Sequence, residues 1–313
     1  MSISQEYKCL VCGNENLQFK QKYELGDLFN LWKPIRFSSE TITELEKQGK
    51  STSLYFCPVC ELEMFLPQII GNDSFYKDLS TNPEAKYYEN EKWDFCEAVN
   101  EVGKNESIIE LGCGPGRFLE LAQNNGAKVL GIEYNKDAIE IAKKRGFTIY
   151  NENFDKASFF EKFDSAFSFH VLEHVKDPLN FIGEMYHLVR KGGFICISVP
   201  NQDGPIKYID PCIMNMPPHH ATRWRLNTFI RIAKHLNLKI IRYAYEPLFL
   251  KSRSYYTYSW LLKKINKQKS PFHKAIFYLI HFQLELFFGV FVLMGFAYFK
   301  ALKGQAIYVV FQK

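Results

Sequence analysis

Short apolar runs alternate with amphipathic segments through the centre of the chain. One such run lies at 108–111, and apolar residues follow it at helical spacing up to residue 124. Similar runs predict further strands at 127–132, 147–150, 163–169, 194–199 and 239–245. Apolar stripes predict helices at 138–144, 178–189 and 226–236. Strands that alternate with helices in this order predict a parallel sheet with helices on both faces.

Three glycines stand at the junction of the first strand and its helix, at Gly112, Gly114 and Gly116. Glycine suits this place because it has no Cβ, so the backbone can turn tightly and approach a ligand closely. A strand-to-helix turn of this kind puts a ligand at the carboxyl edge of a parallel sheet. A dinucleotide fingerprint would need its third glycine where Arg117 stands, and the sequence contains no P-loop pattern. The turn therefore predicts a nucleotide-type cofactor that is not a dinucleotide.

An acidic residue, Glu133, ends the second strand. A carboxylate at this place can accept hydrogen bonds from both ribose hydroxyls of a nucleotide. The alternative is a solvated strand end without a ligand.

Composition places the chain among folded proteins of ordinary character. Its 313 residues suffice for one large core and a smaller appended unit, with 47% hydrophobic and 23% charged residues. The net charge of +5 permits an anionic partner but does not require one. The N-terminal residues are polar and lack the apolar region of a signal peptide, so a cytoplasmic location with reduced thiols is expected.

Four of the eight cysteines form two C-x-x-C pairs, Cys9 with Cys12 and Cys57 with Cys60. Four thiolates suit one tetrahedral zinc ion, and a site filled by four cysteines leaves no place for a catalytic water. We therefore expect a structural zinc in a zinc-ribbon-like module. Disulfides and unconnected thiols are the alternatives. The polar, tyrosine-rich segment that follows, 73–92, is interpreted as a linker into a helix at 89–102.

Further motifs come in order along the central region. They are 110–116 (ELGCGPG), 131–133 (GIE), 170–175 (HVLEHV), 191–193 (KGG) and 198–201 (SVPN). With these motifs the chain resembles the class I S-adenosylmethionine-dependent methyltransferases over about residues 85–247 and the last ten residues. It is most similar to members that act on small molecules, glycans or lipids. The resemblance implies an α/β fold, a doubly wound, seven-stranded Rossmann-like sheet whose last, antiparallel strand is 304–313.

Carried over position by position, the resemblance implies a cofactor site at the glycine turn. Glu110 and the backbone of Gly112, Cys113, Gly114 and Gly116 would hold the methionine part of S-adenosylmethionine. Cys113 has a second interpretation, because a cysteine in such a turn more often serves packing.

The remaining cofactor contacts implied by the resemblance lie at the ends of the next strands. Glu133 would bind the ribose hydroxyls, with Tyr134 beside the adenine. Asn153 and Phe154 would contact the adenine edge and face, and His170 would lie near the sulfonium. Family members often carry an aspartate where Asn153 stands, and a loop cap is the alternative role for this residue.

Methyl transfer from a sulfonium is an in-line displacement, for which an enzyme mainly supplies orientation and proximity. A hydroxyl acceptor also needs a base, and an imidazole or a carboxylate suits that role. Glu173 and His174, after the fourth strand, are one candidate pair. A helix-start acid and a structurally satisfied histidine are the alternatives for these two residues.

A second candidate pair, His219 and His220, lies in the loop 217–224 after the fifth strand. We expect Arg223 and Trp224 to join these histidines in a polar, partly aromatic lip around the acceptor. The alternative is a purely structural loop.

A long insertion, 251–303, separates the sixth predicted strand from the last one. It begins basic and aromatic and becomes apolar from 275 to 299, but its uninterrupted apolar stretch, 286–299, is shorter than the ~20 residues that span a bilayer. Because 304–313 returns to the sheet, both ends of the insertion lie on one side, which argues against a single span. Interfacial helices on the inner face of a membrane, a helical cap and a homodimer face are the interpretations.

Three parts are thus predicted: a zinc-ribbon-like module at 1–75, an S-adenosylmethionine-binding methyltransferase domain at 76–250 and 304–313, and a helical insertion at 251–303. The predicted activity is O-methylation of a small molecule, a sugar or a lipid-linked glycan. An RNA methyltransferase whose zinc module binds nucleic acid is the alternative, disfavoured by the mild charge. A binding or scaffold protein with a degenerate fold is a third hypothesis, against which the intact glycines and Glu133 argue.

Overall fold

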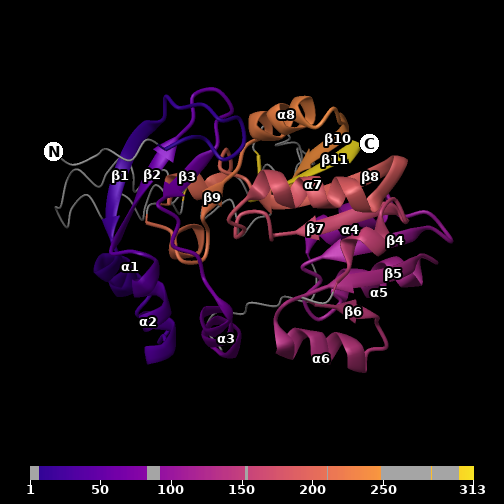
Figure 1. The fold of residues 1–313 in the computed structure, drawn as a ribbon, viewed down its shortest axis with the longest axis horizontal. Helices are drawn as coiled ribbons and strands as arrows, with labels where there is room; N and C mark the ends of the chain where they lie inside the picture. Colours follow the sequence, from indigo (N-terminus) through magenta and orange to yellow (C-terminus); the bar gives the residue numbers. More distant parts are fainter. Residues whose placement is uncertain (1–6, 83–91, 152–153, 210, 248–282, 284–302) are drawn as a thin grey trace.

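The computed structural model describes residues 7–82, 92–151, 154–209, 211–247, 283 and 303–313. Two sheets lie beside each other, the N-terminal one on the left of Figure 1 and the larger one on the right. The strands are β1 (Gln18–Glu24), β2 (Ser51–Phe56), β3 (Glu63–Leu66), β4 (Ser107–Leu111), β5 (Lys128–Ile132), β6 (Ile149–Tyr150), β7 (Phe163–Phe169), β8 (Val189–Pro200), β9 (Thr222–Arg223), β10 (Lys239–Tyr245) and β11 (Ala306–Gln312). The α-helices are α1 (Leu25–Leu31), α2 (Ser39–Gln48), α3 (Asp73–Thr81), α4 (Trp93–Val99), α5 (Arg117–Asn124), α6 (Lys136–Lys144), α7 (Pro178–Leu188) and α8 (Leu226–His235).

The larger sheet has seven strands in the order β10-β11-β8-β7-β4-β5-β6. Neighbouring strands from β8 to β6 are parallel, whereas β11 runs antiparallel to both β8 and β10. The predicted seven-stranded α/β sheet with a last antiparallel strand is therefore confirmed. The chain leaves β4 towards β5 on one side and reaches β7 on the other, so the glycine turn after β4 lies where the strand order reverses. Ligands of such sheets bind at this place, outside the carboxyl ends of the strands.

Helices cover both faces of the sheet, as the alternation along β4 illustrates. Ile108 packs with Phe95 of α4 and Phe118 of α5 in one buried cluster. Its neighbour Ile109 belongs to the opposite cluster, which includes Ile182 of α7. Successive strand residues point to opposite faces, so this apolar run serves two cores at once.

The N-terminal sheet has the order β1-β2-β3-β9, and its last strand is supplied from far along the sequence. β9 pairs antiparallel with β3 through Glu63 opposite Arg223 and Met64 opposite Thr222. The loop after β8 is therefore built into the N-terminal sheet. This connection between the two parts was not predicted.

The interpretation of 73–92 as a linker is wrong for its first half. Residues 73–81 form helix α3, which Asn72 caps through its side chain on the backbone N–H of Phe75. Phe75 and Leu79 are fully buried, in a cluster with Trp32. Polar residues separate Phe75 and Leu79 in the sequence, so the apolar stripe of the helix was not recognised.

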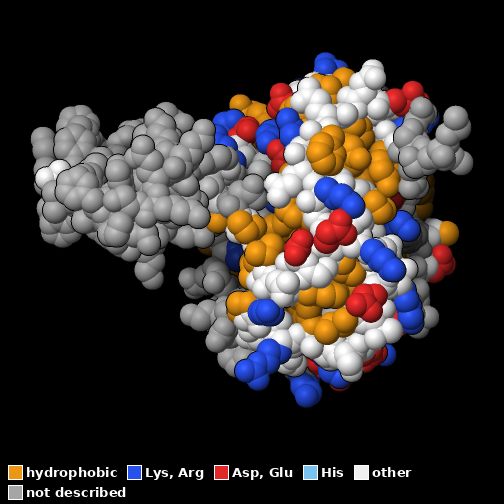
Figure 2. Space-filling model, turned by 90° about the vertical axis from the view of Figure 1, so that its left-hand side faces the viewer, with side chains coloured by type: hydrophobic (Ala, Val, Ile, Leu, Met, Phe, Trp, Pro, Cys, Tyr) orange, Lys and Arg blue, Asp and Glu red, His pale blue; other side chains and the backbone are white. Residues whose placement is uncertain are grey.

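The predicted helical insertion at 251–303 lies almost wholly outside the described residues, so its interpretations stay predictions. Within the described part of the chain, no helix has the length and apolar character needed to cross a membrane. Figure 2, seen from the side of β1 and α1, shows hydrophobic side chains interrupted by Lys, Arg, Asp and Glu. This face therefore carries charges of both signs.

Candidate active site

The glycine turn after β4 adopts a backbone that only glycine takes without strain. Gly112, Gly114 and Gly116 have φ angles of 79°, 51° and 77°. A Cβ on Gly112 would lie 2.3 Å from Val171 Cγ2, because the turn after β7 packs directly against it. The turn thus keeps three backbone segments close together at the carboxyl edge of the sheet.

Glu133, at the end of β5, is fixed by the backbone around it. Its Oε2 accepts a hydrogen bond from the Gly114 N–H at 2.7 Å, and its Oε1 accepts from Tyr134 N–H at 2.8 Å and Asn135 N–H at 2.9 Å. A carboxylate has about four acceptor positions. Three are used here, so contact with both hydroxyls of a ribose requires that one backbone bond is exchanged.

Glu110 is the buried acid of this turn. Its side chain is 2% exposed, and its Oε2 has no hydrogen-bond partner among the described residues. Burial, with the nearby Glu133 charge, raises the pKa of Glu110 well above its usual range. A buried, unsatisfied carboxyl group costs free energy, so a ligand with a donor or a positive charge is expected to bind beside it.

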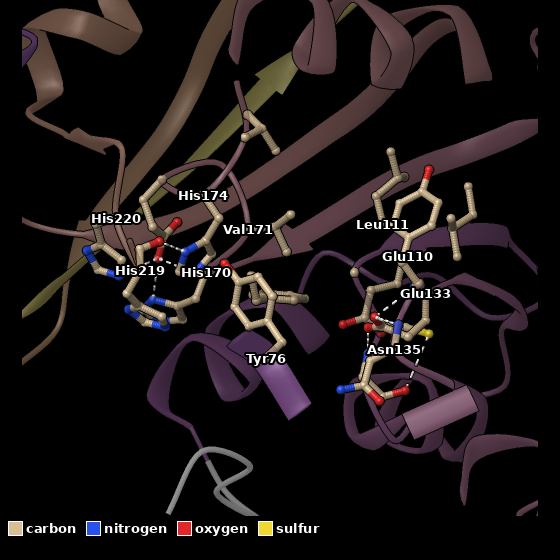
Figure 3. A pocket seen from close by; sticks show the side chains of 18 of the residues that line it. Tyr76, Glu110, Leu111, Glu133, Asn135, His170, Val171, His174, His219 and His220 are labelled. Carbon is tan, nitrogen blue, oxygen red and sulfur yellow. Dashed lines mark hydrogen bonds and ion pairs between the residues drawn. The ribbon is translucent and has the colours of Figure 1, made fainter. Parts of the chain in front are cut away.

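Glu110 and Glu133 lie on one side of a cavity of about 1670 Å³. We call the lining made by Glu110, residues 112–115 and Glu133 the glycine wall, whereas Gly116 packs against Phe147 away from the cavity. The opposite side, seen in Figure 3, carries His170, His174, His219 and His220. With Glu173 these residues make up the histidine wall. Pockets for one small ligand measure ~300–1,000 Å³, so this cavity has room for a cofactor and a second molecule.

Three imidazole rings of the histidine wall are in mutual contact. The ring centroids of His174 and His219 are 4.5 Å apart, those of His174 and His220 4.9 Å, and those of His219 and His220 4.5 Å. His174 lies in the turn after β7, whereas the other two precede β9. Hydrogen bonds from the Ala221 and Thr222 N–H groups to the Glu173 carbonyl, at 2.8 and 3.3 Å, join these two segments.

Each of these imidazoles has its Nδ1 beside a carbonyl oxygen. The partner of His174 Nδ1 is His219 O at 2.5 Å, and that of His219 Nδ1 is Met214 O at 3.0 Å. His220 Nδ1 lies 3.0 Å from Asn215 Oδ1. Carbonyl oxygens only accept hydrogen bonds, so each Nδ1 carries the proton and each Nε2 carries the lone pair.

Burial keeps these three imidazoles neutral. It lowers the pKa of His174, and it lowers the pKa of His219 and His220 well below their usual range, with the neighbouring histidines adding to the effect. A neutral imidazole can accept a proton or bind a metal ion through its lone pair, but it cannot act as an acid.

Glu173 lies among the imidazoles. Its side chain is 1% exposed, and neither carboxylate oxygen has a hydrogen-bond partner within the described ranges. Its Oε1 lies 3.9 Å from Nε2 of both His174 and His220, and 3.5 Å from Nδ1 of His170. The carboxylate therefore faces three imidazoles at distances longer than a good hydrogen bond.

His170 differs from the other three histidines. Burial lowers its pKa, but the carboxylates of Asp94 and Glu173 outweigh this effect and raise the pKa to about 9. Asp94 Oδ2, on α4, lies 3.0 Å from His170 Nε2. Despite its burial, this ion pair lowers the pKa of Asp94. His170 is thus a cation at neutral pH, at the centre of the carboxyl edge.

The structure brings the four predicted catalytic residues, Glu173, His174, His219 and His220, into one cluster. Their roles stay predictions. Of the predicted cofactor residues, Tyr134 is 59% exposed at the cavity edge. Phe154 and His170 also line the cavity, whereas Asn153 lies outside the described residues.

The prediction that Arg223 and Trp224 form an acceptor lip is wrong. Trp224 is fully buried and packs on Phe229 of α8, with ring centroids 5.2 Å apart. Arg223 is 7% exposed, and its Nη1 lies 3.4 Å from Glu63 Oε2 of β3. Neither side chain lines the cavity, because Arg223 contacts Glu63 across the β3–β9 pair and Trp224 packs on α8.

Sequence reasoning also missed Asp94, Tyr76 and Asn215. Asp94 is an acid within an apolar helical stripe. This signal for a functional residue is weak, because acids are also favoured in the first turn of a helix by its dipole. Tyr76 of α3 places its ring 5.9 Å from that of His174, in a segment interpreted as a linker. Asn215 gave no signal in the sequence, because its contact with His220 depends on the loop conformation.

The N-terminal part holds the segment that carries His219 and His220. Arg225 donates from Nη2 to Glu63 Oε1 at 2.6 Å and from Nη1 to Glu61 O at 2.8 Å. Thr228 Oγ1 donates to Cys60 O at 2.8 Å. Cys60, Glu61 and the first residue of β3 therefore anchor the chain directly after β9.

The two C-x-x-C pairs meet in this anchoring region. Cys9 Sγ lies 3.4 Å from Cys60 Sγ, Cys12 Sγ lies 3.5 Å from Cys57 Sγ, and the four sulfur atoms lie within 4.8 Å of one another. All four cysteines are free thiols, so the disulfide alternative is not what the structure shows. Contact with Cys60 lowers the pKa of Cys9 to about 5. Four sulfurs at these distances can surround one tetrahedral metal ion.

Known proteins resemble the central part of this chain in sequence. A family model described as a methyltransferase domain matches residues 86–243, just over half of the 313-residue chain. A ubiquinone biosynthesis O-methyltransferase of Alkalilimnicola ehrlichii is 27% identical over 190 residues, which cover 56% of this chain and 72% of that protein. Its counterpart from Roseobacter denitrificans is 27% identical over 186 residues, covering 57% of this chain and 65% of that protein. In other relatives of the same description the match spans less than half of their length, as in Pelagibacter ubique with 44%.

Among solved structures, a SAM dependent methyltransferase from Archaeoglobus fulgidus superimposes with a TM-score of 0.47 at 17% identity, covering 70% of this chain and 91% of that chain. The family match extends from just before α4 to within β10 and contains the glycine turn and the HVLEHV motif. It does not reach the cysteine pairs. The chain belongs to the methyltransferase-domain family, and it is an S-adenosylmethionine-dependent enzyme.

Proposed function

We propose that this enzyme transfers a methyl group from S-adenosylmethionine to an oxygen atom of a small molecule, a sugar or a lipid-linked glycan. The observation that carries the proposal is the single cavity with two unlike walls. The glycine wall has the acids that suit the cofactor, and the histidine wall has neutral imidazoles and a buried carboxylate that suit a hydroxyl acceptor. The names of the O-methyltransferase relatives agree with oxygen as the acceptor atom.

The residues of the glycine wall fit the cofactor by their chemistry. Glu110 offers an unsatisfied buried carboxyl group to the methionine ammonium, and Glu133 offers its remaining acceptor capacity to the ribose hydroxyls. Tyr134 and Phe154 supply aromatic faces for the adenine. When bound, S-adenosylmethionine supplies a methyl group on a positively charged sulfur, which becomes a neutral thioether after the transfer.

The histidine wall orients the acceptor and receives its proton. A hydroxyl oxygen that attacks the methyl group loses a proton, and the buried carboxylate of Glu173 offers an acceptor for it beside the three imidazoles. Protonated His170 balances part of the negative charge of Asp94 and Glu173. General base assistance of this kind contributes ~10²–10⁴-fold to a rate.

The four cysteines are proposed to hold a structural zinc ion. Their sulfur atoms are close enough for one ion, and Cys60 is bonded through its carbonyl to α8, next to the histidine segment. The zinc would therefore stabilise the chain next to the histidine wall without contacting the reacting atoms. The boundaries of the three predicted parts stay part of this proposal.

The test is to incubate the enzyme with a cell extract and S-adenosylmethionine that carries an isotopically labelled methyl group. We expect the label in a small-molecule, sugar or lipid-linked product, on oxygen, as fragment masses in mass spectrometry show. Label in the RNA fraction, removed by ribonuclease, would instead establish the RNA methyltransferase. The Glu133→Ala variant serves as the control for chemical labelling without enzyme.

A further inference from the structure

We propose that His174, His219 and His220 form a binding site for a divalent transition-metal ion, such as Zn²⁺, which holds the acceptor oxygen. This site is separate from the four cysteines. Its role in catalysis rests on the proposed function, whereas its existence does not.

Convergence of ligand atoms is the first observation. The three histidines each offer one nitrogen, and these nitrogens lie within 4.8 Å of one another. Because the Nδ1 atoms face carbonyl oxygens, Nε2 is the nitrogen of each ring that carries the lone pair. Imidazole is a preferred ligand of Zn, Cu, Fe and Ni ions, and three histidines leave a fourth position for a water or a substrate.

The surroundings of the rings are the second observation. In metal sites the ring nitrogen that does not bind the ion usually donates to a carbonyl or carboxylate, which fixes the tautomer and the orientation. All three rings have such a partner here, from His219 O, Met214 O and Asn215 Oδ1. Asn215 is itself held, since its Nδ2 donates to Gln202 Oε1 at 3.0 Å.

The buried carboxylate of Glu173 is the third observation. Glu173 is buried without a hydrogen-bond partner in the described part of the chain, and its Oε1 lies 3.9 Å from two of the ligand nitrogens. His170 lies between the two acids, with its Nδ1 3.5 Å from Glu173 Oε1 and its Nε2 3.0 Å from Asp94 Oδ2. A cation among the three rings would give the buried Glu173 carboxylate an electrostatic partner, without which its burial is costly.

A metal ion at this place gives the histidine wall a specific role. A hydroxyl group bound to the ion loses its proton more readily, as water does on zinc. The proton passes to Glu173, the oxygen uses the freed electron pair to bond the methyl carbon, and the carbon–sulfur bond pair stays on sulfur. An acceptor with one hydroxyl group near a second oxygen would bind the ion best.

The experiment is a metal titration of the full-length protein, stripped with a chelator and produced without a histidine tag. Equilibrium dialysis with Zn²⁺ should give two equivalents per chain in the wild type. With Co²⁺, the cysteine site should show sulfur-to-cobalt charge-transfer absorption, whereas the second equivalent should add only the weaker d–d bands of nitrogen and oxygen ligands.

Variants assign the second equivalent. His219→Ala and His220→Gln should weaken it by more than about 100-fold, and Asn215→Ala by about 10-fold, because loss of an orienting partner costs ~10–100-fold in affinity. His235→Ala, which changes an exposed histidine on α8, should leave both equivalents unchanged. Retained binding of S-adenosylhomocysteine shows that a variant is folded.

The proposal is overturned if the wild type binds only the equivalent with thiolate absorption. It is also overturned if a second equivalent binds to His219→Ala and His220→Gln as tightly as to the wild type. Two equivalents in an enzyme that labels RNA would keep the metal site and reject the proposed small-molecule function.

Discussion

The glycine wall comes from one stretch of sequence, from Glu110 to Glu133, whereas the histidine wall draws on segments that are far apart. His174 follows β7, His219 and His220 precede β9, and Cys60 and Glu63 hold the chain directly after β9. The glycine wall follows from the backbone conformation of one local turn. The histidine wall depends on the N-terminal sheet, whose last strand, β9, comes from far along the sequence. The donor side of such an enzyme is therefore easier to recognise than its acceptor side.

The largest expected effect tests the chemistry of the histidine wall. Glu173→Gln keeps the size of the side chain but removes the proton acceptor, so methyl transfer to a hydroxyl should fall about 10²–10⁴-fold. Affinity for S-adenosylhomocysteine, measured by calorimetry, should change less than about 3-fold, because the glycine wall is intact. Glu140→Gln on the exposed side of α6 is the matched control. A similar rate in Glu173→Gln and the wild type would remove Glu173 from the mechanism.

At the glycine wall we expect a loss of cofactor affinity. Gly112→Ala places a Cβ 2.3 Å from Val171 Cγ2 at a φ of 79°, which strains the turn by about 1–3 kcal/mol. We expect the affinity for S-adenosylhomocysteine to drop by about 10–100-fold, while the second metal equivalent is retained. Gly183→Ala on α7, where a Cβ meets nothing within 4 Å, should leave the affinity unchanged. Equal affinity in the two variants would contradict the tight turn.

A smaller effect, on stability, is expected at the ion pair between His170 of the histidine wall and Asp94 of α4. The pKa of His170 is raised to about 9 from an unfolded value of ~6.5. Its contribution to the free energy of unfolding is therefore complete below pH ~6.5 and is lost as the pH rises through about 9. The pKa of Asp94 is lowered, so its own contribution is lost only as the pH falls through the acidic range.

Asp94→Asn should therefore destabilise the protein by about 2 kcal/mol at pH 6, and the difference from the wild type should shrink towards pH 10. Urea unfolding at the two pH values measures this change. Asp137→Asn, an exposed acid also in the first turn of a helix, controls for the helix dipole. A pH-independent difference would mean that Asp94 acts through packing instead of charge.

The sequence predicts the glycine wall better than the histidine wall. The seven strands, the glycine turn and Glu133 are readable because each depends on spacing within about 25 residues. The clustering of His174 with His219 and His220 could not be derived, although each residue was a candidate, because it depends on the Ala221 bond to Glu173 and on β9 joining β3. The same pairing places Arg223 against Glu63, and Trp224 packs on α8 instead of lining the cavity. The apolar stripe of α3 was not recognised because polar residues separate its members.

The most direct test of two separable walls is calorimetric titration of S-adenosylhomocysteine into the wild type, Glu133→Ala and His220→Ala. We predict one site per chain in the wild type, at least about 10-fold weaker binding in Glu133→Ala, and nearly unchanged binding in His220→Ala. Equal binding in the wild type and Glu133→Ala, or loss of binding in a folded His220→Ala, would contradict the account.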